Sequence, residues 1–207
     1  MTNNSSSQLP IYLLGENILS IYLASKFSQI GEKVIIISSP QNNSNKEYIV
    51  KEEQSLNKNK FCYTPQPYTF ENSKLLIITS PSQTIKSDLI FISPKLLTST
   101  PCLIFSNQQN FSVAENIIGK QLISGWFKGW LQQDDHTITA LNEMPEIILS
   151  KDYHNLENCL NTLSLLNRTG LKCTTTEDKT LTYWEHFAPI FIGTFLCAKE
   201  QQNFSQI

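Results

Sequence analysis

The opening strand-helix-strand pattern of the sequence restricts the chain to a small set of folds. The apolar run Ile11–Leu14 stops at Gly15 and predicts a short buried strand. Apolar residues at helical spacing predict a helix over 17–30, which Gly31 terminates, and Val34–Ile37 predicts a second buried strand. Strand, helix and strand in this order form a right-handed parallel unit, the building block of sheets with helices on both faces.

The remaining elements extend this unit along the chain. The sequence predicts strands at 75–78 and 102–105, helices at 83–92 and 113–118, and a polar turn at 106–110 between them. The lysine-rich stretch 41–60 predicts mostly loop with a short edge element. Alternating or short apolar runs predict antiparallel strands at the sheet's edge at 121–125, 136–141 and 146–149. We expect a helix at 156–167, a short strand at 172–176 and a last helix at 181–198.

These elements predict an α/β protein. We expect a Rossmann-type, doubly wound and mostly parallel sheet, with an antiparallel extension at one edge and a C-terminal helix. The predicted organisation is a disordered leader at 1–8, a Rossmann domain at 9–150 and a helical C-terminal extension at 151–207.

Composition excludes several other classes of protein. The net charge is −2 and Arg168 is the only arginine, so we expect no nucleic-acid partner. No apolar run reaches the roughly 18 residues that span a bilayer, and 1–8 lacks the basic start of a signal peptide, so we expect no membrane segment. The five cysteines are widely spaced, without metal-ligand spacing, which predicts reduced thiols in a cytoplasmic protein that binds no metal.

A candidate dinucleotide site follows the first strand. The usual fingerprint there is GxGxxG, of which Gly15 is retained while Asn17 and Ser20 replace the other two glycines. A pyrophosphate would lie at the N-terminus of the following helix, where free N–H groups and the helix dipole favour an anion. We therefore assign Gly15, Glu16, Asn17, Ile18 and Leu19 to the cofactor, although the Glu16 charge opposes a phosphate. A Rossmann-like sheet without a cofactor is the alternative.

The second strand bears on the choice between NAD and NADP. NAD enzymes place an acid at its end to bind the ribose hydroxyls, and 38–44 contains none. NADP is therefore favoured, with Ser38, Ser39 and Asn42 near the 2′-phosphate, although a solvated polar loop would look the same. The segment after the third strand completes the predicted cofactor contacts with Thr79, Ser80 and Pro81.

The order of elements from Ile11 to about Ala198 resembles the ketopantoate reductase family. Besides the opening unit, the resemblance rests on Cys102-Leu-Ile-Phe-Ser-Asn107-Gln-Gln and on 161–198, which contains Gly170-Leu-Lys-Cys, Glu177-Asp178 and Trp184-Glu-His-Phe. It implies NADPH-dependent reduction of ketopantoate to pantoate, a step of pantothenate and coenzyme A biosynthesis. It also implies that Asn107 is the active-site asparagine, at a position that serves cofactor and catalysis alike.

The sequence departs from the family at several positions. His186 stands where the family has its catalytic lysine, and Ile190 stands where it has an asparagine four residues later. Pro81 stands where the family has a lysine after the third strand. We expect a C-terminally shortened member that lacks the family's helical domain beyond its first helix.

Reducing a 2-oxo acid requires a hydride donor, a proton donor and a cation for the carboxylate. Asn107 is expected to hold the substrate or the nicotinamide ribose. His186 is a candidate proton donor, or a structural histidine on an apolar helix. Lys128, in the aromatic segment 125–130, is the other candidate, or a solvated surface lysine.

Two alternative functions and the oligomeric state remain open at this point. The first alternative is a reductase of another 2-oxo acid, and the second is a non-catalytic nucleotide-binding module. The last helix carries apolar residues around most of its circumference, too many for one packed face. This predicts a homodimer that helps close the active site, with a monomer whose helix folds back as the alternative.

Overall fold

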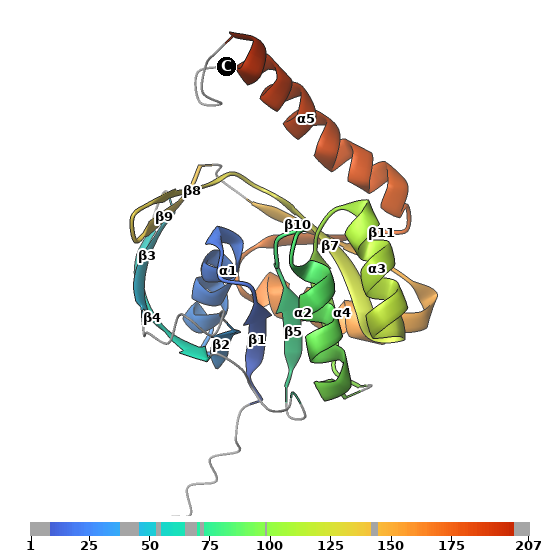
Figure 1. Ribbon diagram of the computed structural model, residues 1–207. Helices are drawn as coiled ribbons and strands as arrows, with labels where there is room; N and C mark the ends of the chain where they lie inside the picture. Colours follow the sequence, from blue (N-terminus) through green and yellow to red (C-terminus); the bar gives the residue numbers. More distant parts are fainter. Residues whose placement is uncertain are drawn as a thin grey trace, which may run out of the picture.

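The computed structural model describes residues 9–37, 46–52, 55–64, 70, 73–97, 99–141 and 145–200. In these ranges eleven strands form one sheet in the order β11-β10-β7-β6-β5-β1-β2-β4-β3-β9-β8 (Figure 1). The strands are β1 Ile11–Leu14, β2 Val34–Ile37, β3 Lys46–Glu52, β4 Ser55–Thr64, β5 Leu75–Ile78, β6 Cys102–Phe105, β7 Leu122–Lys128, β8 Leu131–Asp134, β9 Thr137–Ala140, β10 Glu146–Ser150 and β11 Lys172–Thr176.

The centre of the sheet is parallel and buried on both faces. β1 lies between β2 and β5, and β6 and β7 continue the parallel pairing on the β5 side. Successive side chains enter different cores: Leu13 and Ile77 belong to one cluster, and Leu14 and Ile78 to the other. Burial on both faces explains why these strands are continuous apolar runs in the sequence.

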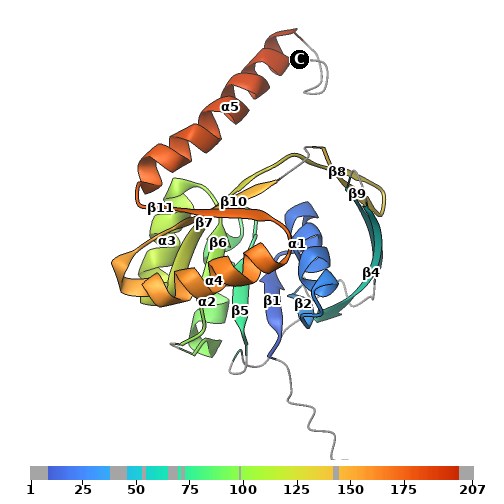
Figure 2. The same ribbon diagram turned by 180° about the vertical axis from the view of Figure 1, so that it is seen from behind.

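Helices cover both faces, which makes the sheet doubly wound. α1 Ile18–Gln29 and α4 Leu156–Arg168 lie on one face (Figure 2), where Phe27 and Leu166 enter the same core. α2 Ile85–Ile92 and α3 Gln108–Ile118 cover the other face with residues that include Leu89 and Ala114. The Rossmann-type fold predicted from the sequence is confirmed.

The prediction of loop for 41–60 was wrong. β3 and β4 form a long antiparallel hairpin that pairs Lys46 with Phe61 and Glu52 with Ser55. β4 also joins β2 in parallel, so the hairpin continues the main sheet and curves around α1 (Figure 1). On β3, Tyr48 and Val50 are buried while Glu47 and Lys51 are exposed. One solvated face supplies the polar residues that resembled a loop.

The predicted antiparallel strands differ in place or direction. β7 was expected antiparallel at the edge, but it lies inside the sheet, parallel to β6 and antiparallel to β10. The β8–β9 hairpin lies at the opposite edge from β10, where β9 pairs with β3. Strand partners so far apart in sequence depend on tertiary packing, and local apolar patterns do not encode them.

The C-terminal segment contributes both sheet and helix. β11 pairs with β10 in parallel, and α5 Lys179–Glu200 then leaves the sheet and rises above it (Figures 1 and 2). The boundary expected at 150–151 stays a prediction. No helix in the described ranges is long and apolar enough to cross a membrane.

A buried carboxylate links two helices to the amino end of a central strand. Glu32, whose side chain is 2% exposed, lies 2.6 Å from Lys74 Nζ and 3.3 Å from Arg168 Nη1. These three residues join the end of α1, the start of β5 and the end of α4. The only arginine of the sequence is therefore engaged in a structural ion pair.

Replacing Glu32 with alanine should lower the free energy of unfolding by about 1–3 kcal/mol, because charge-assisted hydrogen bonds are lost from a buried site. Urea denaturation at pH 7 measures this change. Glu185, an exposed carboxylate on α5, provides the matched control. Equal effects of Glu32→Ala and Glu185→Ala would contradict the assignment.

Candidate functional site

The carboxyl ends of four parallel strands bring most of the predicted site residues to one edge. Gly15 follows β1, Thr79 follows β5, Asn107 follows β6 and Lys128 ends β7. Open α/β sheets bind their ligands at this edge. The structure therefore assembles the predicted residues where a Rossmann sheet places its site.

The turn after β1 requires glycine. Gly15 has φ +109°, and a Cβ built on it would lie 3.0 Å from Thr79 Oγ1 and 3.1 Å from the Ser80 nitrogen. Both the left-handed backbone and the close approach of the next strand exclude a side chain. This retained glycine of the fingerprint therefore closes the turn onto the segment after β5.

Asn17, which stands at the position of the fingerprint's second glycine, forms hydrogen bonds with its side chain that a glycine could not form. Its Oδ1 accepts from the Ser20 backbone N–H at 3.0 Å, and its Nδ2 donates to the Thr79 carbonyl at 2.6 Å. Ser20 Oγ in turn accepts from the Asn17 N–H at 3.0 Å, which completes a capping box. Asn17 thereby caps α1 and ties it to β5.

The residues at this turn fit a dinucleotide. The first helical turn of α1 carries no acidic residue, and in the described part of the chain the N–H groups of Ile18 and Leu19 have no hydrogen-bond partner. The Ser80 hydroxyl beside Gly15 is buried and also lacks a partner among the described residues. Unpartnered donors at a helix N-terminus suit a pyrophosphate or a sugar hydroxyl.

The other predicted cofactor residues fall into two groups. Glu16 and the exposed Pro81 lie in the same two turns, whereas Ser38, Ser39 and Asn42 lie outside the described residues.

A second polar cluster lies at the ends of β5 and β6. α3 begins at Gln108, earlier than predicted, because the polar residues expected to form a turn supply its cap and first turn. Asn107 Oδ1 accepts from the Asn110 N–H at 3.0 Å, and Asn107 Nδ2 donates to Ser82 Oγ at 3.2 Å. The nearly buried Asn110 donates from Nδ2 to Ser82 Oγ at 3.0 Å and to Ser106 Oγ at 2.7 Å. Asn107 itself is exposed at the sheet edge.

The structure brings Lys128 close enough to His186 for its charge to act on the imidazole. α5 passes above β7, and both side chains are half-buried. Burial, followed by the charge of Lys128, lowers the pKa of His186 below its usual 6.5. The two residues proposed for proton donation therefore share one environment, although they lie 58 positions apart.

The aromatic segment at the end of β7 is mainly packing. Trp126 contacts Phe111 of α3 edge-on at 5.3 Å, and Phe127 contacts Tyr22 of α1 at 5.9 Å. The two rings thus anchor β7 to the helices on opposite faces, which fixes the strand that carries Lys128.

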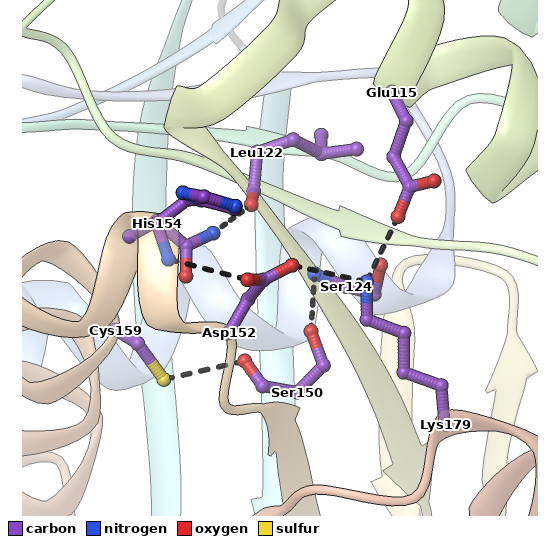
Figure 3. A network of polar contacts seen from close by, with 9 residues as sticks. Glu115, Leu122, Ser124, Ser150, Asp152, His154, Cys159 and Lys179 are labelled. Carbon is purple, nitrogen blue, oxygen red and sulfur yellow. Dashed lines mark hydrogen bonds and ion pairs between the residues drawn. The ribbon is translucent and has the colours of Figure 1, made fainter.

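A separate pocket of about 780 Å³ lies at the start of α5. Its lining residues are Lys151, Asp152, Leu156, Glu177, Asp178, Lys179 and Thr180. Lys179 Nζ lies 2.9 Å from Glu115 and 3.7 Å from Asp152 (Figure 3). Lys151 pairs with Glu177 at 3.2 Å. Both lysines of the lining are engaged in ion pairs and no predicted site residue lines the pocket, so we do not assign it to the candidate site.

Thiol and metal chemistry find no support in the described residues. Cys102 and Cys159 are buried free thiols, and burial raises both pKa values, that of Cys102 to about 12. No cluster of three or more potential metal ligands occurs in the ranges that the structure describes.

Sequence reasoning missed the roles of Ser82 and Asn110. Neither residue belongs to a motif, and Ser82 directly follows the predicted cofactor contacts Thr79, Ser80 and Pro81. Their contact joins residues 28 positions apart, so it becomes visible only when β5 and β6 lie side by side.

Comparison with known proteins supports the fold. No protein-family model matches the sequence, and no curated protein matches it. Solved structures do match. The 2-dehydropantoate 2-reductase from Geobacter metallireducens is 19% identical, with a TM-score of 0.78, over 94% of this chain and 66% of that one. A ketopantoate reductase from Ralstonia eutropha is 14% identical, with a TM-score of 0.69, over 85% and 59% of the two chains.

A third similar structure is D-mandelate dehydrogenase with NADH and anilino(oxo)acetate. It is 12% identical, with a TM-score of 0.69, over 82% of this chain and 57% of that one. The present chain thus spans about three-fifths of the length of these proteins. The resemblance to ketopantoate reductases predicted from the sequence is confirmed at the level of the fold.

Proposed function

We propose that this chain, which shares the fold of ketopantoate reductases, reduces a 2-oxo acid with NADPH, and that ketopantoate is its substrate. The observation that carries the proposal is the single sheet edge that holds the Gly15 turn, Asn107 and the Lys128–His186 pair. That edge combines a nucleotide-binding turn with polar groups suited to a small anionic substrate.

Each residue has a distinct proposed role. Ile18 and Leu19 N–H groups and the Ser80 hydroxyl would hold the dinucleotide, which supplies a hydride when bound. Asn107 holds the substrate. His186 donates the proton to the oxygen that becomes the alcohol, and Lys128 supplies positive charge beside it. NADPH is preferred over NADH because 38–44 carries no acidic residue.

The test is NADPH oxidation by the purified protein against ketopantoate and a small panel of other 2-oxo acids. We expect turnover with ketopantoate and slower turnover with NADH. Turnover of another member of the panel in preference would make the chain a related reductase, as the likeness to D-mandelate dehydrogenase suggests. Calorimetric binding of NADPH without any turnover would identify a non-catalytic module.

Two further properties belong to this proposal. The buried free thiols Cys102 and Cys159 suit the reducing cytoplasm. The exposed apolar face of α5 suits a second copy of the chain, which would help to close the candidate active site.

The pH dependence of reduction distinguishes the two proton donors. The pKa of His186 in the folded protein lies below 6.5, so folding favours the neutral imidazole. The neutral imidazole therefore contributes to the free energy of unfolding above pH 6.5, and this contribution is lost as the pH falls through the lowered pKa. A reaction that uses protonated His186 should therefore accelerate as pH decreases below about 6.5. His186→Gln should abolish this rise, and Lys128→Gln should shift it toward higher pH.

An NMR titration of His186 checks the same shift without any activity. Its midpoint should lie below 6.5 and move upward in Lys128→Gln, with burial accounting for the remaining displacement. A rate that does not rise at acid pH in the unmodified enzyme would instead favour Lys128 as donor.

A further inference from the structure

We propose that Ser82 and Asn107 together bind the carboxylate of the substrate, an inference that rests on the proposed reductase function. Ser82 lies just before α2 and is exposed at the candidate site. Two amide groups from a neighbouring element fix its side chain. Ser82 Oγ accepts from Asn107 Nδ2 at 3.2 Å and from Asn110 Nδ2 at 3.0 Å.

This arrangement determines the direction of the remaining hydrogen bond. A serine hydroxyl has two acceptor lone pairs and one proton. The two amides occupy both lone pairs of Ser82 Oγ, so its O–H is left to donate. Within the described ranges no residue accepts that proton, and the exposed side chain presents it at the sheet edge.

Asn107 adds a second donor at the same point. Its Oδ1 is occupied by the Asn110 N–H, and one Nδ2 hydrogen is donated to Ser82. The other Nδ2 hydrogen has no acceptor in the described part of the chain. An O–H and an N–H side by side thus both offer a proton, and each of the two acceptor oxygens already accepts at least one hydrogen bond. A ligand group that only accepts fits this pair of donors best. An ionised carboxylate is such a group.

The position of the only arginine supports this choice. Arginine is the usual bidentate partner of a carboxylate. Arg168 is held at the opposite edge of the sheet, 3.3 Å from the buried Glu32. A 2-oxo acid bound at the carboxyl ends of β5 and β6 must therefore find neutral donors or a lysine, and Ser82 with Asn107 provides two neutral donors.

Ser82→Ala tests the inference. We expect KM for ketopantoate to rise about tenfold, the size of one lost hydrogen bond to a charged group, while kcat stays within about twofold. KM for NADPH and the melting temperature should not change. Ser82→Thr, which keeps the hydroxyl, should restore KM for ketopantoate. Ser87→Ala is the matched control, because that exposed hydroxyl donates within α2, to the Thr84 carbonyl at 2.6 Å.

The outcomes separate this inference from the function on which it rests. An active enzyme whose KM for ketopantoate is unaltered in Ser82→Ala would overturn the carboxylate site and leave the reductase standing. A rise in KM for NADPH instead would show that the hydroxyl faces the cofactor, which also overturns it. A lower melting temperature without rescue by threonine would reduce Ser82 to a structural residue. Unmodified protein that oxidises NADPH with none of the 2-oxo acids would overturn both proposals.

Discussion

Replacing Asn107 with alanine should lower kcat/KM for the 2-oxo acid about 100-fold, the usual cost of removing an active-site donor. The structure adds a second effect. Asn107 Oδ1 caps α3 through the Asn110 N–H, so the alanine variant should also lose about 1 kcal/mol of stability.

A serine at the same position separates the two effects. Asn107→Ser keeps a capping oxygen and loses the amide N–H, so its stability should stay near that of the unmodified protein while kcat/KM remains low. Steady-state kinetics and urea denaturation of both variants provide the comparison. Unaltered kinetics in Asn107→Ser would show that Asn107 is only a helix cap.

Replacing Phe191 and Phe195 together with glutamate should convert the proposed homodimer into a monomer. Phe191 is 58% exposed, Phe195 is 61% exposed and Trp184 is 55% exposed, all on α5. Rings on this helix contact one another in series, with Tyr183 stacked on Phe187 at 5.5 Å and Phe187 on Phe191 at 5.8 Å. Such a continuous aromatic surface is unusual on a monomer and suits a second copy.

Light scattering at micromolar concentration measures the assembly. We expect twice the chain mass of 23.6 kDa for the unmodified protein and the chain mass itself for the double variant. Two charges per subunit at the centre of an interface should raise Kd by about 100-fold or more. Leu141→Glu is the control, because Leu141 is 57% exposed and lies just after β9, outside α5. An unmodified protein that is monomeric and fully active would remove the need for a partner.

Local sequence predicted the centre of this fold because burial there leaves a strong pattern. The strands at 11–14, 34–37, 75–78 and 102–105 and the helix after Gly15 appear in the structure as expected. A strand buried on both faces must be apolar throughout, and a turn at φ +109° with neighbouring atoms near 3 Å must be glycine. These requirements act on each segment separately, so the sequence shows them directly.

Tertiary structure decided which segments meet. The pairing of β4 with β2, of β3 with β9 and of β7 with β6 joins segments that are separated along the chain. The apolar patterns of these strands, which are half-solvated or mixed, do not specify such partners. The same is true of the candidate site. Sequence identified Asn107, Lys128 and His186 one by one. Only folding brought the charge of Lys128 within range of His186 and placed Ser82 within hydrogen-bond distance of two amides. Chemistry at a sheet edge arises from loops that adjacent strands bring together, so its geometry is a property of the assembled sheet.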